Sequence, residues 1–201
     1  GENPINTLSF SYNYLHRFYT DHSDVSSGDH AAALSAAVTS GKVRVSTSHS
    51  LSYLTGIQGG NQVIAEQSNR LQFSDQLRVS LNLTPKSDIY FSGTYSETDQ
   101  AETSVFADIS NWNTAAGYGF KYSEGLRFFS QVSYGQQATV NRGGQGTERV
   151  WDLVGGSIGA EGEFTEKLTG TLQFGYQQRS SDLTDISAGA PTVTVELEQL
   201  L

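Results

Sequence analysis

The sequence predicts an all-β fold made of long antiparallel strands that are joined up and down. Apolar and polar residues alternate from Leu71 to Leu83, tight turns alternate with longer polar loops, and the chain is aromatic but poor in other core residues. Only 36% of its residues are hydrophobic, yet ten are Tyr and ten are Phe. Together these observations favour an antiparallel up-and-down transmembrane β-barrel with about 9–10 visible strands.

The hairpin from Leu71 to Tyr95 shows the pattern most clearly. Its first arm keeps period-two alternation over the thirteen residues Leu71–Leu83, which gives one apolar and one polar face. A turn at Thr84-Pro85-Lys86-Ser87 follows, and the second arm alternates again. Ordinary strands have about 5–6 residues, whereas a strand that crosses a bilayer at a tilt needs about 9–11. The length therefore favours a membrane-spanning strand.

The same reading along the chain predicts one β-barrel domain over residues 1–201. The predicted strands cover 5–19, 31–39, 42–54, 67–83, 88–97, 110–122, 126–136, 149–164 and 168–179, with a tenth candidate at 191–198.

Short turns and long loops alternate between these strands. The turns centre near residues 41, 85, 124 and 166, so a hairpin unit recurs about every 40 residues. Tyr95, Tyr134 and Tyr176 each lie nine residues after the equivalent turn residue. The spacing predicts that these three tyrosines lie at one common height on the apolar face.

The turn sequences Leu83-Thr84-Pro85-Lys86, Tyr122-Ser123-Glu124-Gly125 and Phe164-Thr165-Glu166-Lys167 occupy equivalent places. With its one-ended turns, the chain resembles bacterial porin-like outer-membrane β-barrels, and loosely a β-barrel porin type in which Thr-Pro-Lys-type turns open the up-strands. The resemblance extends through Gln178 and implies a location in the outer membrane of a Gram-negative-type bacterium, with the apolar face against lipid. It implies aromatic girdles formed by Tyr14, Tyr53, Tyr95, Tyr134 and Tyr176 at one interface and by Phe120, Tyr122 and Phe164 at the other.

One departure from this resemblance concerns the end of the sequence. Many such barrels end in an aromatic residue, whereas this sequence ends Glu198-Gln199-Leu200-Leu201. Either this tail is not the closing strand, or the chain is part of a larger barrel.

Composition narrows the class of protein. The sequence has no Cys, which excludes disulfides and thiolate sites, and its net charge of −9 argues against nucleic-acid binding. No apolar run approaches the length of a transmembrane helix, so a membrane protein of this sequence would have to be a barrel.

The start at Gly1-Glu2-Asn3-Pro4, without Met, suggests a processed end or a cloning boundary. The expected partners are membrane lipid and either other envelope proteins or further copies of the chain.

No group of residues suggests catalysis, a cofactor or a metal. His16, His22, His30 and His49 have no spacing typical of metal ligands, and Asp21-His22-Ser23-Asp24 has too few ligands for a calcium loop. The stretch Arg142–Gly146 lacks the Gly-Lys-Ser/Thr ending of a phosphate loop, and no Gly-x-Ser-x-Gly elbow occurs. We therefore expect no enzymatic activity, no cofactor and no metal.

The polar face carries the residues that we expect to line the interior. These lumen-lining candidates are Lys42, Arg44, Arg78, Asp88, Lys121, Arg127, Glu161 and Glu163. In a narrow barrel they would pair across the interior and plug it, and in a wide or oligomeric barrel they would line a channel and set its ion preference. Asp75 and Asp152 fall on the apolar face, and we expect both near the loop end, where charge costs little.

Three functions remain open from the sequence. The first is an outer-membrane barrel that acts as a porin-like channel or as a structural component. The second is a subunit of a larger envelope assembly, with the acidic or polar loops Glu97–Asp108 and Gln136–Arg149 as binding surfaces. The third is a soluble secreted β-sandwich, an adhesin or carbohydrate-binding module, whose polar face would be wet.

Overall fold

The structure is a computed structural model that describes residues 5–17, 27–57, 67–101, 107–141, 148–165, 167–181 and 186–199. Ten long strands account for nearly all of them. The strands are β1 (Ile5–Arg17), β2 (Ser27–Ser40), β3 (Val43–Ile57), β4 (Gln67–Thr84), β5 (Ser87–Ala101), β6 (Ala107–Lys121), β7 (Leu126–Asn141), β8 (Glu148–Thr165), β9 (Leu168–Ser181) and β10 (Ile186–Gln199).

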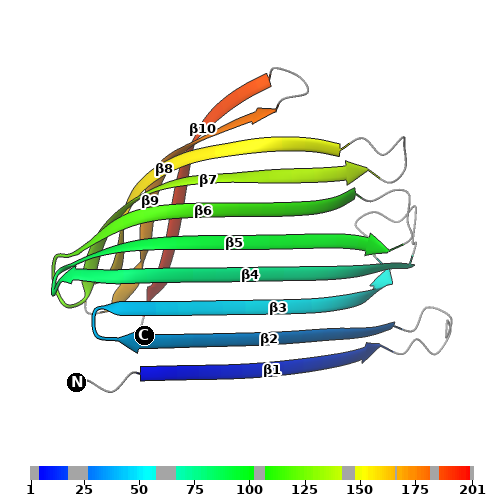
Figure 1. Ribbon diagram of the computed structural model, residues 1–201, viewed down its shortest axis with the longest axis horizontal. Coiled ribbons are helices and arrows are strands. Elements are labelled where there is room, and N and C mark those ends of the chain that lie inside the picture. The colour runs from blue at the N-terminus through cyan, green and yellow to red at the C-terminus, as the bar shows by residue number, and fades with distance from the viewer. Residues whose placement is uncertain are drawn as a thin grey trace.

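The ten strands form one antiparallel sheet in which each strand pairs with its neighbour in sequence, from β1 to β10. The predicted all-β, up-and-down order is confirmed. The sheet is strongly curved, so that β9 and β10 turn behind the earlier strands in the view of Figure 1. Among the described residues, β1 and β10 pair with one neighbour each and not with one another. The described part of the chain contains no helix that is long and apolar enough to cross a bilayer.

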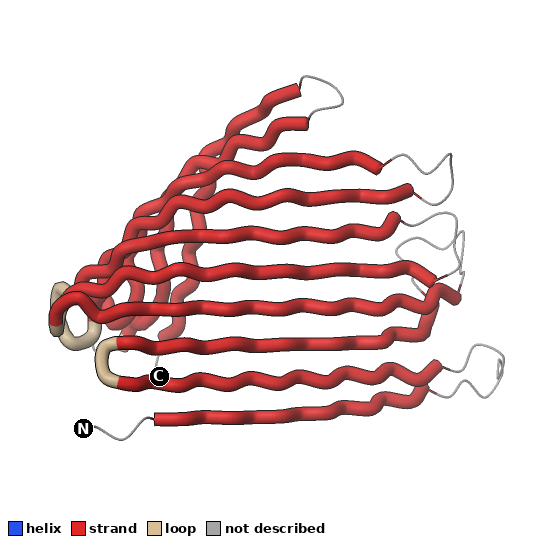
Figure 2. Tube along the Cα trace, viewed as in Figure 1, coloured by secondary structure: helices blue, strands red, loops and turns tan. Residues whose placement is uncertain are grey.

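The tight turns all lie at one end of the sheet (Figure 2). Gly41 and Lys42 join β2 to β3, and Gly41 has a φ of 57°, a left-handed conformation that a residue without a Cβ adopts without strain. The predicted strands at 31–39, 42–54, 88–97, 110–122, 126–136 and 191–198 fall short of β2, β3, β5, β6, β7 and β10, because pairing continues into the polar residues that flank them. Most of Glu97–Asp108 and Gln136–Arg149 is therefore strand, and only 102–106 and 142–147 lie outside the described residues.

The two faces of the sheet differ in accessibility. Outward side chains such as Val132 and Ile158 are 65% and 64% exposed, whereas Tyr90 and Ala115 on the opposite face are 6% and 7% exposed. Curvature explains the difference, since side chains diverge on a convex face and crowd together on a concave one. The convex, outer face is the apolar one, and the concave, inner face is the polar one.

The strand register reveals how the sheet is tilted. Tyr95 lies opposite Trp112, which lies opposite Gln136, so Tyr134 is two residues closer to the turn end than Tyr95. Tyr134 is likewise level with Gln178, two residues from Tyr176. The aromatic row therefore shifts by one residue per strand. With a rise of about 3.3 Å per residue and a strand spacing of about 4.8 Å, this shift corresponds to a tilt of about 35°.

The same three tyrosines lie at a constant distance from the tight turns. They come eight residues after the first residues of β5, β7 and β9, which are Ser87, Leu126 and Leu168. Eight residues span about 27 Å along a strand, or about 22 Å along the normal to a membrane at this tilt. That height is close to the apolar band of about 25 Å that transmembrane barrels present to lipid.

The fold differs from the soluble β-sandwich that the sequence left open as an alternative. A sandwich buries apolar side chains between two layers, but the described strands form a single sheet. Phe91 and Phe174, which would belong to such a core, are 51% and 56% exposed on the outer face.

Candidate solute-contacting wall

A cluster of charged and polar side chains lies on the inner face of β4–β8, in the half of the sheet nearest the tight turns. Strand alternation directs these side chains inward, and register brings neighbouring strands level, since Arg127 lies opposite both Lys121 and Glu161. We call this group the inner polar cluster. It contains Arg78, Asp88, Tyr90, Arg127, Gln131 and Glu161.

Arg127 is the centre of the inner polar cluster. Its Nε and Nη2 donate to the two carboxylate oxygens of Asp88 at 3.1 and 2.7 Å, and its Nη1 donates to Glu161 at 2.6 Å. The side chains of Arg127 and Asp88 are only 16% and 11% exposed. The planar guanidinium fits this two-point contact, which makes the ion pair both strong and directional.

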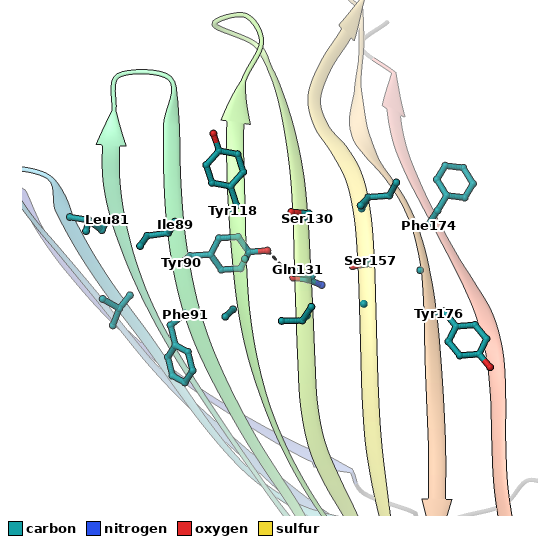
Figure 3. Close-up of a pocket in the computed structure, with 17 residues that line it drawn as sticks. Leu81, Ile89, Tyr90, Phe91, Tyr118, Ser130, Gln131, Ser157, Phe174 and Tyr176 are labelled. Atoms are coloured by element: carbon teal, nitrogen blue, oxygen red, sulfur yellow. Dashed lines mark hydrogen bonds between the residues drawn. The ribbon is translucent and has the colours of Figure 1, made fainter.

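Tyr90 links Arg127 to the rest of the cluster. Its hydroxyl donates to Gln131 Oε1 at 2.8 Å, and the Arg78 guanidinium carbon lies 4.0 Å from the centre of its ring. The Arg127 guanidinium is also near the ring, at 5.7 Å. Figure 3 shows Tyr90 and Gln131 pointing toward each other, while Phe174 and Tyr176 point away from them on the outer face.

Two glycines of β6 make this arrangement sterically feasible. Tyr90 on β5 reaches Gln131 on β7 by passing over Gly117, and Arg127 on β7 reaches Asp88 on β5 by passing over Gly119. A Cβ at Gly117 would overlap the Tyr90 ring, and a Cβ at Gly119 would overlap the Arg127 guanidinium. The missing side chains of β6 therefore allow β5 and β7 to interact directly.

The inner face of β1–β3 is built differently, mostly from small hydroxyl-bearing and alanine side chains. Two shallow hollows of about 290 and 270 Å³ lie on it. Arg78 borders the smaller hollow, together with Ser35, Ser46, Ser48, Thr7 and Gln76. This region has room for water or a solute.

Charge is unevenly distributed over the turn half of the inner face. Among the described residues, β3–β7 carry the cations Arg44, Arg78, Lys121 and Arg127 against one carboxylate, Asp88. The charged side chains at the inner positions of β8 and β10 in that half are all carboxylates, and they lie close in height because Thr171 is level with both Glu161 and Glu196. These carboxylates are Glu161, Glu163, Glu196 and Glu198.

The remaining lumen-lining candidates do not join the inner polar cluster. Lys42 lies in the turn before β3, Arg44 is exposed on β3, and Lys121 is exposed at the end of β6. Glu163 is exposed and packs where a Cβ of Gly125 would be. The structure thus brings together four of the eight predicted residues, Arg78, Asp88, Arg127 and Glu161.

The aromatic candidates of the loop-side girdle lie on the outer face. Tyr14, Tyr53, Tyr95, Tyr134 and Tyr176 are between 37% and 57% exposed. At the turn end, Tyr122 is 68% exposed, and its ring packs edge to face on that of Phe128 with 6.1 Å between the ring centres. Phe164 lies near the end of β8 and is half-buried.

Polar groups on the outer face gather beside this girdle. Asp75 bonds His49, whose other ring nitrogen lies 3.0 Å from Thr47 Oγ1. Asp152 accepts hydrogen bonds from Tyr134 at 3.0 Å and Gln136 at 2.8 Å.

The heights of the two aspartates follow from the register. Asp75 is level with Tyr95 across the β4–β5 pair, and Asp152 is level with Gln136, two residues beyond Tyr134. Both carboxylates therefore lie near the loop side of the apolar band, as expected.

A third hollow, of about 970 Å³, runs across the outer face between two rows of apolar side chains (Figure 3). One row runs from Leu81 through Ile158 to Phe174, and the other runs from Val79 through Val132 to Tyr176. Because its walls are apolar and open outward, this hollow suits acyl chains rather than a polar solute.

No metal site is evident in the part of the chain that the structure describes, where no three His, Asp or Glu side chains are grouped suitably. The stretches Asp21–Asp24 and Arg142–Gly146 lie outside the described residues.

Sequence reasoning missed the importance of Tyr90, Gln131, Gly117 and Gly119. The available signal was an aromatic residue on an otherwise polar face, at Tyr90, beside a strand whose inward positions are Ala115, Gly117 and Gly119. A large side chain next to a row of small ones indicates that it crosses over them.

Comparison with known proteins agrees with this description. No family model and no curated protein matches the sequence. Solved structures of OmpT, an outer membrane protein of Vibrio cholerae, do match. Its loop L8 deletion mutant has a TM-score of 0.55 at 13% identity over 96% of this chain and 62% of that one.

Two further structures of OmpT match in the same way. The outer-membrane expressed form has a TM-score of 0.55 at 13% identity over 90% of this chain and 55% of that one. The in-vitro folded form, described as a trimer, has a TM-score of 0.52 at 13% identity over 92% of this chain and 64% of that one. The chain thus spans less than two thirds of the length of these proteins. Its fold is that of an outer-membrane β-barrel wall.

Proposed function

We propose that this protein lies in the outer membrane and forms part of a water-filled, porin-like channel for small polar solutes. The supporting observation is the contrast between the two faces, with exposed apolar side chains outside and charged or hydroxyl-bearing side chains inside. An interior meant only for structural packing would not need the open, serine-lined surface of β1–β3. The proposed role is non-enzymatic.

The test is pore formation by the full-length protein, purified in detergent and reconstituted into planar lipid bilayers. Discrete conductance steps in potassium chloride, and swelling of liposomes in small sugars, are expected. Protein unfolded by boiling before reconstitution is the control. Absence of conductance from protein with heat-modifiable gel migration, which reports a folded barrel, would refute the channel.

A second candidate function is that of a subunit in a larger envelope assembly. Within the described sheet, β1 and β10 each have only one paired edge, which favours it because unpaired backbone groups in hydrocarbon are costly and invite strand addition. Further copies of this chain are one proposed partner, in line with the trimer form of the similar OmpT structure. Chemical crosslinking in membranes tests this. Crosslinked dimers or trimers are expected, and recovery of the monomer alone would count against the assembly.

A further inference from the structure

Arg78 differs from the other inner cations in how it is held. Its guanidinium stacks 4.0 Å from the Tyr90 ring centre, and its side chain is half-buried, whereas Arg44 and Lys121 are exposed. Stacking fixes the plane of a guanidinium and leaves its N–H groups directed outward at the edge. Arg78 is therefore oriented before any solute arrives.

The carboxylates of the inner polar cluster are committed to another residue. Both oxygens of Asp88 and one oxygen of Glu161 accept hydrogen bonds from Arg127. Within the described ranges, the ion pairs of the protein involve Arg17 and Arg127, and none involves Arg78. The charge of Arg78 is therefore not neutralised by a described carboxylate and can interact with a solute in the interior.

The surroundings of Arg78 supply further hydrogen-bond donors. It borders the hollow of about 270 Å³ that is also lined by Ser46, Ser48 and Gln76, and by Ser35, whose hydroxyl is bonded to that of Ser9. Guanidinium and hydroxyl groups are the donors from which carboxylates and phosphates accept hydrogen bonds.

On this basis we propose that Arg78 and the adjacent hollow form a binding site for small solutes that carry an oxyanion group, either carboxylate or phosphate. The site rests on the proposed function for its biological role, because a solute must enter the interior to reach it. Tyr90 acts as a positioning residue, since it holds the guanidinium but presents its own hydroxyl to Gln131.

The first experiment measures binding without requiring a pore. Succinate and, separately, inorganic phosphate are titrated into the folded full-length protein in detergent micelles, and binding is followed by ligand-observed NMR, with glycerol as the neutral probe. We expect saturable binding of at least one anion, and none of glycerol. The tighter of the two anions identifies the preferred group. Equal response to all three probes would overturn the proposal.

The variants then locate the site. Arg78→Gln is expected to weaken anion binding by at least tenfold. The double variant Ser46→Ala and Ser48→Ala keeps the Arg78 charge and its contact with the Tyr90 ring, and it should weaken binding by about threefold. Arg179→Gln is the matched control, because Arg179 stacks on Trp151 toward the other end of the sheet, and it should stay within twofold of the wild type. Binding unchanged by both the Arg78 variant and the serine variant would overturn the site.

Tyr90→Leu tests the positioning role separately. It keeps Arg78 but removes the stacking surface, so binding should weaken and the preference between succinate and phosphate should narrow. An unchanged preference between succinate and phosphate would show that Tyr90 does not position Arg78 for binding.

Conductance distinguishes this site from the channel itself. Anion block of single channels that is lost in Arg78→Gln supports both proposals. Anion binding in micelles without any conductance supports the site and refutes the channel, whereas conductance without anion binding refutes the site alone.

Discussion

The inner face of β1–β3 and the inner face of β5–β8 are parts of the same sheet, yet they are stabilised in different ways. The first is lined by small side chains such as Ser35, Ser46 and Ser48, which are too short to reach past an adjacent strand, as the 2.6 Å bond between the Ser35 and Ser9 hydroxyls illustrates. The second is bound together by Arg127 and Tyr90, whose contacts reach two strands away. Side chains in the first half, such as Arg17 and Asp29, join adjacent strands only, whereas those of the second half brace strands that are two apart.

The largest effect is expected from Arg127→Met, which removes the brace and leaves Asp88 buried without its partner. Loss of one partner of a buried ion pair should lower the free energy of unfolding by about 3 kcal/mol. Urea unfolding in detergent micelles measures it. Arg44→Met, on the opposite half, is the control and should change stability by less than about 0.5 kcal/mol. Equal losses in the two variants would contradict the comparison.

A second prediction contrasts the two faces at one point of β8. Ile158→Lys places a charge on the lipid side of the apolar band and should cost about 2–4 kcal/mol. Ser157→Lys places the same side chain one residue away, on the inner face, where water is available, and should be nearly neutral. Refolding into lipid vesicles at several urea concentrations gives both values. If Ser157→Lys proved the more damaging, the assignment of faces would be reversed.

A third prediction concerns the small residues under the brace. Gly117→Ala introduces a Cβ that overlaps the Tyr90 ring, and the strain should cost about 1–3 kcal/mol. Gly93→Ala is the control, because its Cβ would meet nothing within 4 Å. Combining Gly117→Ala with Tyr90→Ala should remove most of the added strain, and a fully additive double variant would argue against the overlap.

The smallest effect is expected on the unbraced half. Ser50→Gln enlarges an exposed side chain on the inner face of β3 and should change the free energy of unfolding by less than about 0.5 kcal/mol. Chemical unfolding under the same conditions as for Gly117→Ala gives a direct comparison. A loss as large as that of Gly117→Ala would show that both halves are tightly packed.

Much of the fold could be predicted from the sequence because strand alternation is a local property. The alternation over Leu71–Leu83 and the recurring turns predicted the strand order, the two faces and the end at which turns gather. Strand ends were harder to predict, since residues such as Thr98 and Gln137 extend the sheet by pairing with distant partners, Ile109 and Trp151. Polar composition does not reveal such pairing.

The site was predictable only in part. Alternation assigned Arg78, Asp88, Arg127 and Glu161 to one face, but not which of them meet. Contact depends on the one-residue shift per strand and on the space above Gly119, which are properties of three strands together. A sequence read one strand at a time contains neither.

The one-residue shift per strand has a consequence for how such a wall can change in size. Adding or deleting a whole hairpin moves the following strands by two positions along the ladder, and the next tyrosine is displaced by the same amount, so its depth in the bilayer is preserved. Removing a single strand would instead reverse the direction of every later segment and bring turns to the opposite surface. The two-strand unit is therefore the smallest piece by which this architecture can grow or shrink while every remaining segment stays at its proper depth.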